Sequence, residues 1–322
     1  MTHVRKLRLD NRMIRRTHYS GWHYAVQQLE PLCAEDGIHV DTFLEWTFAV
    51  ELAESLRTRL IPYQKPWIGF FHNPPGIPEW HEYWSSPQVL LSHPLMRDSL
   101  RSCKGLLTLS RTMAAWLASR VDVPVLALVH PTTAPKSTFS MDRFLAARER
   151  RVIQVGWWLR RLTSIAQLPV SSLQRAILHP LPDDQLGPFQ EAIDREVLSG
   201  GAPAELVRGI ARIPYQTNQG YDELLSSSIV FVDLYDAVAN NTVIECVMRN
   251  TPILVNPLPS VVEYLGSDYP LYFNSLSEAG RKADDLGCIG AACQYLQELS
   301  KEGFSGESFR EALARSSLYH AL

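Results

Sequence analysis

The chain has 322 residues, 46% of them hydrophobic and 20% charged, and a net charge of −3 at pH 7. This composition is ordinary for a globular protein, and the length suits two domains of about 150 residues each. The small net charge gives no support to nucleic-acid binding, and no apolar run reaches the roughly 20 residues of a membrane-spanning helix. Five scattered cysteines without a C-x-x-C pair indicate reduced thiols in a cytoplasmic protein and argue against a zinc site.

The charge is divided unevenly along the chain. Residues 1–150 carry 18 Lys and Arg against 14 Asp and Glu, whereas residues 151–322 carry 13 against 20. Six of the basic residues lie within residues 1–16, which lack the apolar stretch of a signal peptide. We interpret this basic start either as solvated surface or as a contact with an anionic acceptor or with the inner face of a membrane.

Strand-like and helix-like segments alternate through the first half of the chain. Apolar strands are expected over residues 4–9, 38–46, 67–72, 105–110 and 123–131, and helices over 22–33, 48–60, 88–103 and 111–121. Short buried strands that alternate with helices predict a parallel, doubly wound sheet. The polar stretch of residues 132–150 breaks this alternation.

The same pattern starts again after residue 150. Strands are expected over residues 152–156, 175–181, 207–215, 229–234, 252–256 and 270–275, with helices over 186–199, 220–228, 277–300 and 306–318 and in the two segments that follow Asn241 and Pro259. We therefore predict an N-terminal Rossmann-like domain over 1–135, a linker over 136–150, a C-terminal Rossmann-like domain over 151–302 and a terminal helix over 303–322.

The segment from Ile213 to Gly266 is the most informative part of the sequence. An apolar strand, IVFVDL, leads into the polar loop YDAVANN, then a helix with Glu245, then the strand PILVN. Ligands of open α/β sheets bind where strand ends meet helix N-termini. Asn240, Asn241 and Thr242 can cap this helix and direct its free N–H groups at an anion, and Glu245 can accept two hydroxyls of a ribose or a sugar.

This order of elements resembles the C-terminal domain of GT-B glycosyltransferases, in which it binds the nucleotide-sugar donor. The resemblance covers most of the chain and implies two Rossmann-like domains facing each other across a cleft. It implies a nucleotide-diphosphate sugar as substrate, no further cofactor and no metal. It also implies that the terminal helix over 303–322 returns to the N-terminal domain.

The resemblance places donor-binding residues in the second domain. Arg160 and Arg161 follow the strand over 152–156, and guanidinium groups bind phosphate oxygens in bidentate fashion, so they are the candidates for a diphosphate clamp. The alternative is that they lie on the surface or pair with carboxylates. The Gly-Arg-x4-Lys pattern of the retaining relatives is absent after Gly156.

The acidic residues depart from the family pattern as well. The position eight before Glu245 is Ala237, so the chain has no E-x7-E motif, and either Asp236 or Asp233 would replace the first acidic residue. Asp236 is preferred because it lies in the loop. Glu263 resembles the acidic residue of a G-G-x-P-E turn, and Tyr215 ends a strand whose edge contacts the nucleobase in relatives.

The first domain is expected to bind the acceptor. His72 ends the strand over 67–72, where a side chain reaches the ligand crevice, and it is our candidate for a base or an acceptor contact. His18, Gly21 and Trp22 belong to the first loop, and Trp80 lies in an aromatic cluster that can stack on a sugar. A purely structural role is the alternative for each of them.

The sequence thus favours a metal-independent glycosyltransferase in which His72, Arg160 and Glu245 carry the chemistry. Its acceptor would be a glycan, a lipid-linked glycan, a small molecule or a protein. The alternatives are a catalytically silent module that binds a nucleotide or a partner, and a nucleotide-sugar epimerase or phosphorylase on the same scaffold. No G-x-S-x-G, P-loop, H-E-x-x-H or G-x-G-x-x-G motif is present.

Overall fold

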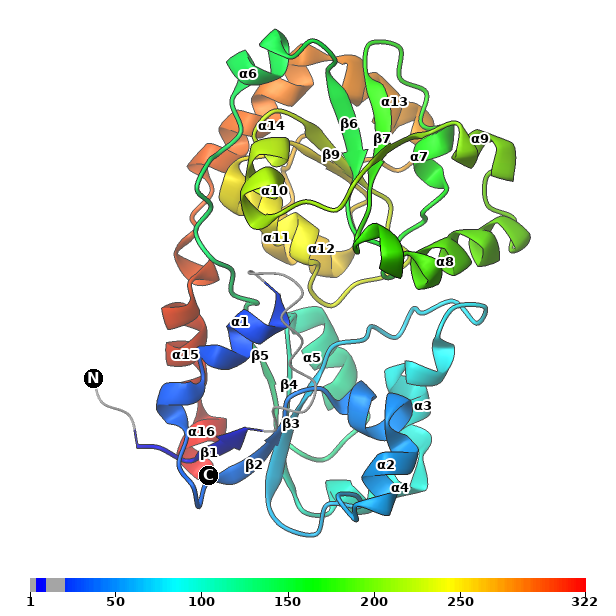
Figure 1. The fold of residues 1–322 in the computed structure, drawn as a ribbon. Coiled ribbons are helices and arrows are strands. Elements are labelled where there is room, and N and C mark those ends of the chain that lie inside the picture. Colours follow the sequence, from blue (N-terminus) through cyan, green and yellow to red (C-terminus); the bar gives the residue numbers. More distant parts are fainter. Residues whose placement is uncertain (1–3, 10–20) are drawn as a thin grey trace. The chain divides into compact units, whose positions relative to one another are not determined.

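The computed structural model describes residues 4–9 and 21–322. The chain forms two compact α/β units, each built on a parallel sheet (Figure 1). The first unit contains the chain up to Thr133 together with residues 236–239 and 302–322, and the second contains 134–235 and 240–301. The predicted α/β class with two Rossmann-like parallel sheets is confirmed. Within the described residues, no helix is long and apolar enough to cross a membrane.

The sheet of the first unit has five parallel strands in the order β1-β2-β3-β4-β5. Its strands are β1 (Leu7–Leu9), β2 (Ile38–Asp41), β3 (Trp67–Phe71), β4 (Cys103–Thr108) and β5 (Val125–Ala127). Every residue of β3 is buried, because helices cover both faces of the sheet around this central strand. The helices of the unit are α1 (Trp22–Gln27), α2 (Leu52–Arg57), α3 (Pro87–Ser92), α4 (Pro94–Leu100), α5 (Arg111–Ala118), α15 (Gly306–Ala314) and α16 (Ser317–Ala321).

The C-terminal helices complete the core of this first unit. Phe309, Leu313 and Tyr319 are almost fully buried among side chains of the sheet. The Lys6 ammonium donates to the backbone carbonyl of Tyr319 over 3.1 Å. Figure 1 shows α15 and α16 beside α1 and the first strand. The end of the chain is therefore part of the same hydrophobic core as its beginning.

The sheet of the second unit also has five parallel strands, in the order β10-β9-β6-β7-β8. They are β6 (Arg151–Gln154), β7 (Gln174–Leu178), β8 (Ala211–Ile213), β9 (Ile229–Val232) and β10 (Ile253–Val255). Of these five strands, β6 comes first in the sequence and lies in the middle of the sheet. The order of the strands reverses direction between β6 and β9. In such sheets, ligands bind outside the carboxyl ends of the strands at this switch point.

Helices pack around this second sheet, as Figure 1 shows. They are α6 (Met141–Ala146), α7 (Ser164–Gln167), α8 (Gly187–Leu198), α9 (Ala204–Arg208), α10 (Asn218–Leu225), α11 (Asn241–Arg249), α12 (Pro259–Leu265), α13 (Leu276–Asp284) and α14 (Leu286–Glu298). The helix that carries the motif residues is α11. It begins after the N-cap Asn240 and ends at Arg249. Its C-cap, Asn250, adopts the left-handed conformation with φ 56°.

Some sequence expectations fail in detail. The strand expected over 207–215 is shorter, because α9 extends to Arg208 and only Ala211–Ile213 joins the sheet. The strand expected over 270–275 reduces to a single bridge between Val255 and Tyr272. The first helix ends early, since Pro31 has no N–H to continue it and forms a 3₁₀ turn instead.

The expected linker over 136–150 belongs to the second unit. The backbone N–H of Phe139 donates to the carbonyl of Arg249 over 2.7 Å, and that of Ser140 donates to Ser226. The Phe144 side chain on α6 is fully buried. Polar composition suggested a spacer, but one buried aromatic residue and two backbone hydrogen bonds attach the segment to the second unit.

We expect Leu313→Ala to lower the free energy of unfolding by about 2–5 kcal/mol, since it leaves a cavity in the core of the first unit. Leu198→Ala, at the 87% exposed end of α8, is the control and should change it by less than about 0.5 kcal/mol. Urea unfolding measures both variants. Equal stabilities would show that the C-terminal helices do not belong to this core.

Candidate active site

The loop after β6 places Arg160 against the N-terminal end of α11. Gly156 allows this close approach because it has φ 75° and because a Cβ there would lie 2.6 Å from the Arg160 Cζ. One guanidinium nitrogen, Nη1, donates to the Trp158 carbonyl over 2.7 Å. The other, Nη2, donates to the Thr242 hydroxyl over 2.9 Å and to the Asn240 side-chain oxygen over 3.3 Å. The side chain is thus fixed by the first residues of α11.

The N-terminus of α11 is capped and polar. The Asn240 side chain accepts from the backbone N–H of Val243 over 3.2 Å, as its position in the sequence suggested. Asn240 and Thr242 are buried, whereas Asn241 between them is exposed. A helix of nine residues carries a partial positive charge at this end, which favours a bound anion.

Arg160 adds a full positive charge at the same place. It is only 9% exposed, and among the described residues no carboxylate forms an ion pair with it. Its Nε is buried without a hydrogen-bond partner in that part of the chain. Burial lowers the pKa of the guanidinium to about 10, against the opposing influence of Tyr221 and Glu245, so it stays charged at neutral pH. A cation beside a helix N-terminus is unfavourable unless an anion joins them.

Glu245, on the second turn of α11, is buried and already hydrogen-bonded. Its Oε2 accepts from the Tyr221 hydroxyl over 2.5 Å. Burial, followed by the influence of Glu245, raises the pKa of Tyr221 well above its usual range, so the phenol remains a donor. Sequence reasoning missed Tyr221, because its place in the helical pattern of α10 indicates only packing. Part of the hydrogen-bonding capacity that we expected Glu245 to offer to a sugar is used inside the protein.

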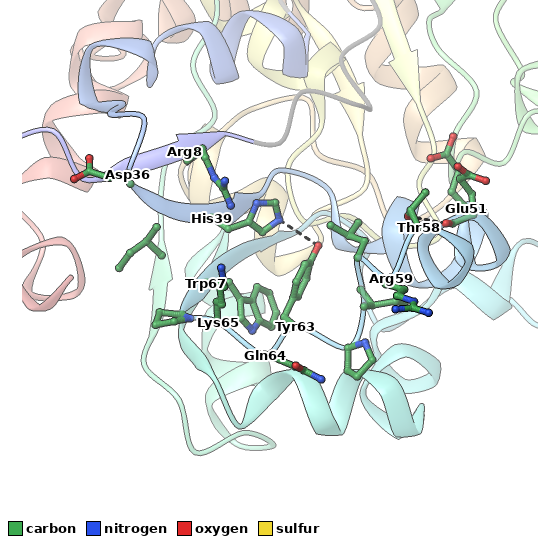
Figure 2. A pocket seen from close by; sticks show the side chains of 17 residues that line it. Arg8, Asp36, His39, Glu51, Thr58, Arg59, Tyr63, Gln64, Lys65 and Trp67 are labelled. Carbon is green, nitrogen blue, oxygen red and sulfur yellow. Dashed lines mark hydrogen bonds between the residues drawn. The ribbon is translucent and has the colours of Figure 1, made fainter.

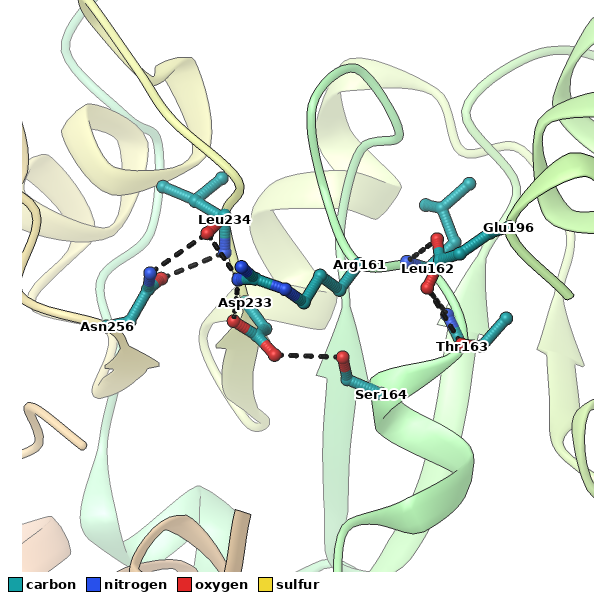
Figure 3. Close-up of polar contacts among 8 residues, drawn as sticks. All are labelled: Arg161, Leu162, Thr163, Ser164, Glu196, Asp233, Leu234 and Asn256. Atoms are coloured by element: carbon teal, nitrogen blue, oxygen red, sulfur yellow. Dashed lines mark hydrogen bonds and ion pairs between the residues drawn. The ribbon is translucent and has the colours of Figure 1, made fainter. Parts of the chain in front are cut away.

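Arg161 is held in an ion pair at the carboxyl end of β9. Its Nη1 donates to Asp233 Oδ1 over 2.8 Å and to the Leu234 carbonyl over 2.6 Å, as Figure 3 shows. The guanidinium also lies over the Tyr235 ring, with its Cζ 4.4 Å from the ring centroid. The second oxygen of Asp233 accepts from the Ser164 hydroxyl over 2.9 Å. The paired state leaves Arg160 as the stronger candidate for a diphosphate clamp.

A pocket of about 500 Å³ adjoins this ion pair, at the carboxyl ends of β9 and β10. Its lining includes Arg161, Asp233, Asn256 and Ser275. The Asn256 amide braces the site, because it accepts from the Leu234 N–H over 2.8 Å and donates to the Leu234 carbonyl over 2.9 Å (Figure 3). The pocket combines a cation, amides and a hydroxyl, which are groups that recognise phosphate or sugar oxygens.

The remaining donor candidates lie apart from Arg160 in the sequence and differ in setting. Tyr215 stands two residues after β8 at the sheet edge and is 39% exposed. Glu263 lies within α12 and is half-buried. The donor-binding roles of both residues stay predictions.

Asp236 is hydrogen-bonded within the first unit, and its role in donor binding stays a prediction. Its Oδ2 accepts from the Gly76 N–H over 2.7 Å, and its Oδ1 accepts from the Ala237 N–H over 2.8 Å. Burial raises the pKa of this carboxyl despite both hydrogen bonds. A Cβ at Gly76 would lie 2.5 Å from Asp236 Oδ2, so the contact requires glycine. Asp236 therefore fastens the loop after β3 within the first unit.

In the first unit, His72 follows β3 and lies among aromatic rings. Its centroid is 4.4 Å from that of Trp22 and 4.2 Å from that of Phe43. The Trp22 indole donates to the Thr42 carbonyl over 2.9 Å, and Gly21 is the N-cap of α1. His18 lies outside the described residues.

Trp80 lies in the loop after β3, half-buried, with its ring centroid 5.6 Å from that of His81. Its neighbour Trp84 is 47% exposed and presents more aromatic surface. The acceptor platform stays a prediction, and Trp84 is a second ring of the aromatic cluster from which it was predicted.

The first unit also contains a hollow of about 1410 Å³ at the opposite end of its strands (Figure 2). Trp67, the first residue of β3, lines it, whereas His72 follows the last. Its walls include His39 and Tyr63, whose side chains approach to 3.3 Å, and the cations Arg8 and Lys65. None of the residues singled out from the sequence lines this hollow.

Among the described residues, no cluster of three His, Cys, Asp or Glu side chains could hold a metal ion. The charged groups of the candidate site in the second unit are instead Arg160, the Arg161–Asp233 pair and Glu245.

Comparisons with known proteins place this geometry in a fold family. No protein-family model and no curated protein matches the sequence. Solved structures do match. TarM from S. aureus shares 11% identity over 92% of this chain and 59% of its own, with a TM-score of 0.57. A sucrose-phosphate synthase from Thermosynechococcus elongatus shares 14% identity over 93% and 76%, with a TM-score of 0.61. HepE from Anabaena shares 10% identity over 97% and 98%, with a TM-score of 0.60.

These neighbours are GT-B glycosyltransferases. The chain therefore has the GT-B fold of two Rossmann-like domains, as the resemblance in its sequence implied. It spans 59% of the length of TarM. Identities of 10–14% establish the fold, and the activity of this chain is argued separately from its own residues.

We expect Gly156→Ala to lower the free energy of unfolding by about 2 kcal/mol or more, because alanine is strained at φ 75° and its Cβ would displace the Arg160 guanidinium. Gly187→Ala is the matched control. It lies at the start of α8 with no atom within 4 Å of the added Cβ, and should stay within about 0.5 kcal/mol of the parent. Urea unfolding compares the two, and equal effects would contradict the close packing.

We expect the buried His130 to lower the stability of the protein when the pH falls. Burial lowers its pKa from 6.5 to about 4, so the unfolded chain takes up a proton that the folded protein does not. Its contribution is fully present above pH 6.5 and is lost as the pH falls toward 4, by up to about 3 kcal/mol. His130→Asn keeps a donor for the Pro131 carbonyl and should reduce this pH dependence of stability. His320→Asn is the control and should not, because the His320 side chain on α16 is exposed. Unfolding at pH 7.5 and 4.5 measures the difference, and parallel slopes would refute the assignment.

Proposed function

We propose that the protein is a metal-independent glycosyltransferase that moves a sugar from a nucleoside-diphosphate donor to an acceptor. The observation that carries this proposal is the setting of Arg160 at the switch point of the sheet. This arginine is buried, forms no ion pair with a carboxylate of the described residues, and is hydrogen-bonded to Asn240 and Thr242 at the start of α11. The structural neighbours support the donor class. HepE was crystallised with UDP-glucose, and TarM with UDP.

Charge development during glycosyl transfer explains why such a site suits the reaction. The bond from the anomeric carbon to the diphosphate breaks, and negative charge grows on the departing phosphate oxygens. A fixed guanidinium and the N–H groups of a helix N-terminus stabilise that charge, and more so in a buried site than in water. Arg160 and α11 therefore take the role that a divalent cation has in other transferases.

The other candidates receive roles in the same reaction. Asn241 is exposed at the start of α11 and is proposed to contact a phosphate or sugar oxygen. Glu245 is proposed to bind a donor hydroxyl beside its hydrogen bond to Tyr221. His72 in the first unit is proposed to accept the proton of the acceptor hydroxyl.

A catalytically silent nucleotide-binding module is the second candidate. The Arg161–Asp233 ion pair and the Glu245–Tyr221 hydrogen bond favour it, because both occupy groups that a transferase would offer to its donor. Release of free sugar or transfer product from a bound donor separates the two functions. Product analysis likewise separates transfer from epimerisation or phosphorolysis.

We expect Arg160→Gln to weaken donor binding about 10- to 100-fold, the effect of losing charged hydrogen bonds of roughly 1.5–3 kcal/mol. The donors to test are UDP-, GDP-, ADP-, dTDP- and CMP-sugars, screened first by thermal shift, since a bound ligand raises the melting temperature. Calorimetric titration with the best of them then compares the variants.

Arg208→Gln is the control for that experiment, because Arg208 is an exposed arginine of the same unit whose ion pair is with Glu205 on α9. It should bind the donor like the parent. If Arg160→Gln binds equally well while its unliganded melting temperature is unchanged, Arg160 is no part of a diphosphate site.

A further inference from the structure

Glu45 is the most completely buried carboxylate near His72, and its two oxygens have different surroundings. Oε1 accepts from two consecutive backbone N–H groups, that of His72 over 2.8 Å and that of Asn73 over 2.7 Å. Oε2 is buried and has no hydrogen-bond partner among the described residues. Glu45 is 1% exposed and immediately precedes a π-helical turn, Trp46–Val50, a type of irregularity that is frequent at functional sites.

The unpaired oxygen faces the His72 ring. Oε2 lies 3.7 Å from Nδ1, and neither ring nitrogen has a hydrogen-bond partner in the part of the chain that the structure describes. The rings of Trp22 and Phe43 pack against the imidazole, and His130 is close enough to interact with it electrostatically. Buried polar atoms without partners are costly, and the cost falls when Nδ1 carries a proton and directs it at Oε2.

We propose that Glu45 is a positioning residue that holds the imidazole of His72 with its proton on Nδ1 and its lone pair on Nε2. The inference rests on the proposed transferase function of His72 and adds the group that prepares it. In that state Nε2 can accept the proton of an acceptor hydroxyl, whose oxygen keeps the electron pair of the broken O–H bond.

The backbone hydrogen bonds make the carboxylate hard to replace. Both N–H groups that Oε1 binds follow β3 directly, so Glu45 fixes the main chain of His72 as well as its ring. A carboxylate has two acceptor oxygens, and here one serves the backbone while the other faces the imidazole. A glutamine has one acceptor and one donor.

We therefore expect Glu45→Gln to change the tautomer of the His72 imidazole. The amide oxygen is needed by the two backbone N–H groups, so the NH₂ group points at Nδ1. That donor requires a lone pair on Nδ1 and leaves the proton on Nε2, where it blocks acceptance of the hydroxyl proton. The substitution changes one atom and keeps the packing of the site.

The first experiment observes the tautomer without any substrate. In protein labelled with ¹⁵N-histidine, long-range ¹H–¹⁵N spectra at pH 8 distinguish a protonated from an unprotonated ring nitrogen, and the His72→Gln variant identifies the signals of His72. We expect the proton on Nδ1 in the parent and on Nε2 in Glu45→Gln. Glu54→Gln, an exposed position on α2 paired with Arg57, should leave the parent tautomer unchanged.

A parent with the proton on Nε2, or a Glu45→Gln variant that keeps it on Nδ1, overturns the proposal. If Glu45→Gln does not fold, Glu45→Asp replaces it. The shorter carboxylate can serve the backbone or the ring but not both, so the His72 signals should show a mixture of tautomers. Because this readout needs no activity, it decides the role of Glu45 even if the chain transfers no sugar.

The kinetic arm separates positioning from a general loss of structure. Glu45→Gln should lower kcat by about 10²- to 10⁴-fold, the usual contribution of a general base, with little change in KM for the donor. On a His72→Gln background, the same substitution should add almost nothing, since both act through one group. A full additional loss in the double variant would assign Glu45 a role independent of His72 and refute the proposal.

Discussion

The structure of the second unit depends on a single positive charge held where a helix begins. Arg160 reaches across a glycine with positive φ and hydrogen-bonds to Asn240 and Thr242. Asn240 is the N-cap of α11, and Thr242 lies in its first turn. The loop after β6 and the start of α11 are thus tied together by a guanidinium. An anion bound there would interact with both positive groups at once, which explains why two groups of the same sign lie together.

Other buried charged side chains of this protein have hydrogen-bond partners for their charged atoms. Arg249, fully buried, donates twice to Asp222 over 2.8 and 2.6 Å. Glu196 accepts from two backbone N–H groups and from the Thr163 hydroxyl, as Figure 3 shows. These groups are fully partnered, as buried charges in a stable protein must be. Within the described part of the chain, Arg160 Nε, Glu45 Oε2 and both ring nitrogens of His72 are, by contrast, buried without a hydrogen-bond partner, and all three side chains follow or face the carboxyl ends of strands. This contrast is the physical reason for assigning them to function.

How far the sequence predicted this arrangement depends on the kind of information required. The strand, polar loop and capped helix around Asn240 were predictable, since apolar runs and cap residues are local signals. The approach of Arg160 to α11 also followed from the order of the elements, because both stand at strand ends of one sheet. The direction of a side chain within a loop leaves no periodic signal. The sequence therefore did not indicate that Asp236 binds the Gly76 N–H. It also did not indicate that Glu45, in a segment predicted as a strand, binds the backbone N–H of His72.

The global charge of the chain would have suggested the wrong place for an anion. The second half carries 13 basic against 20 acidic residues and yet provides the candidate phosphate site. The structure explains this difference, because three of the acidic residues bind donors inside the protein. They are Asp222, Asp233 and Glu196. Exposed acidic residues beyond about 10 Å contribute little at physiological ionic strength, because salt screens them. The field at the start of α11 is set by groups within a few ångströms, and there Arg160, reinforced by the helix, forms no ion pair with a carboxylate of the described residues. Local pairing, more than net charge, decides which surface of an acidic protein can bind a diphosphate.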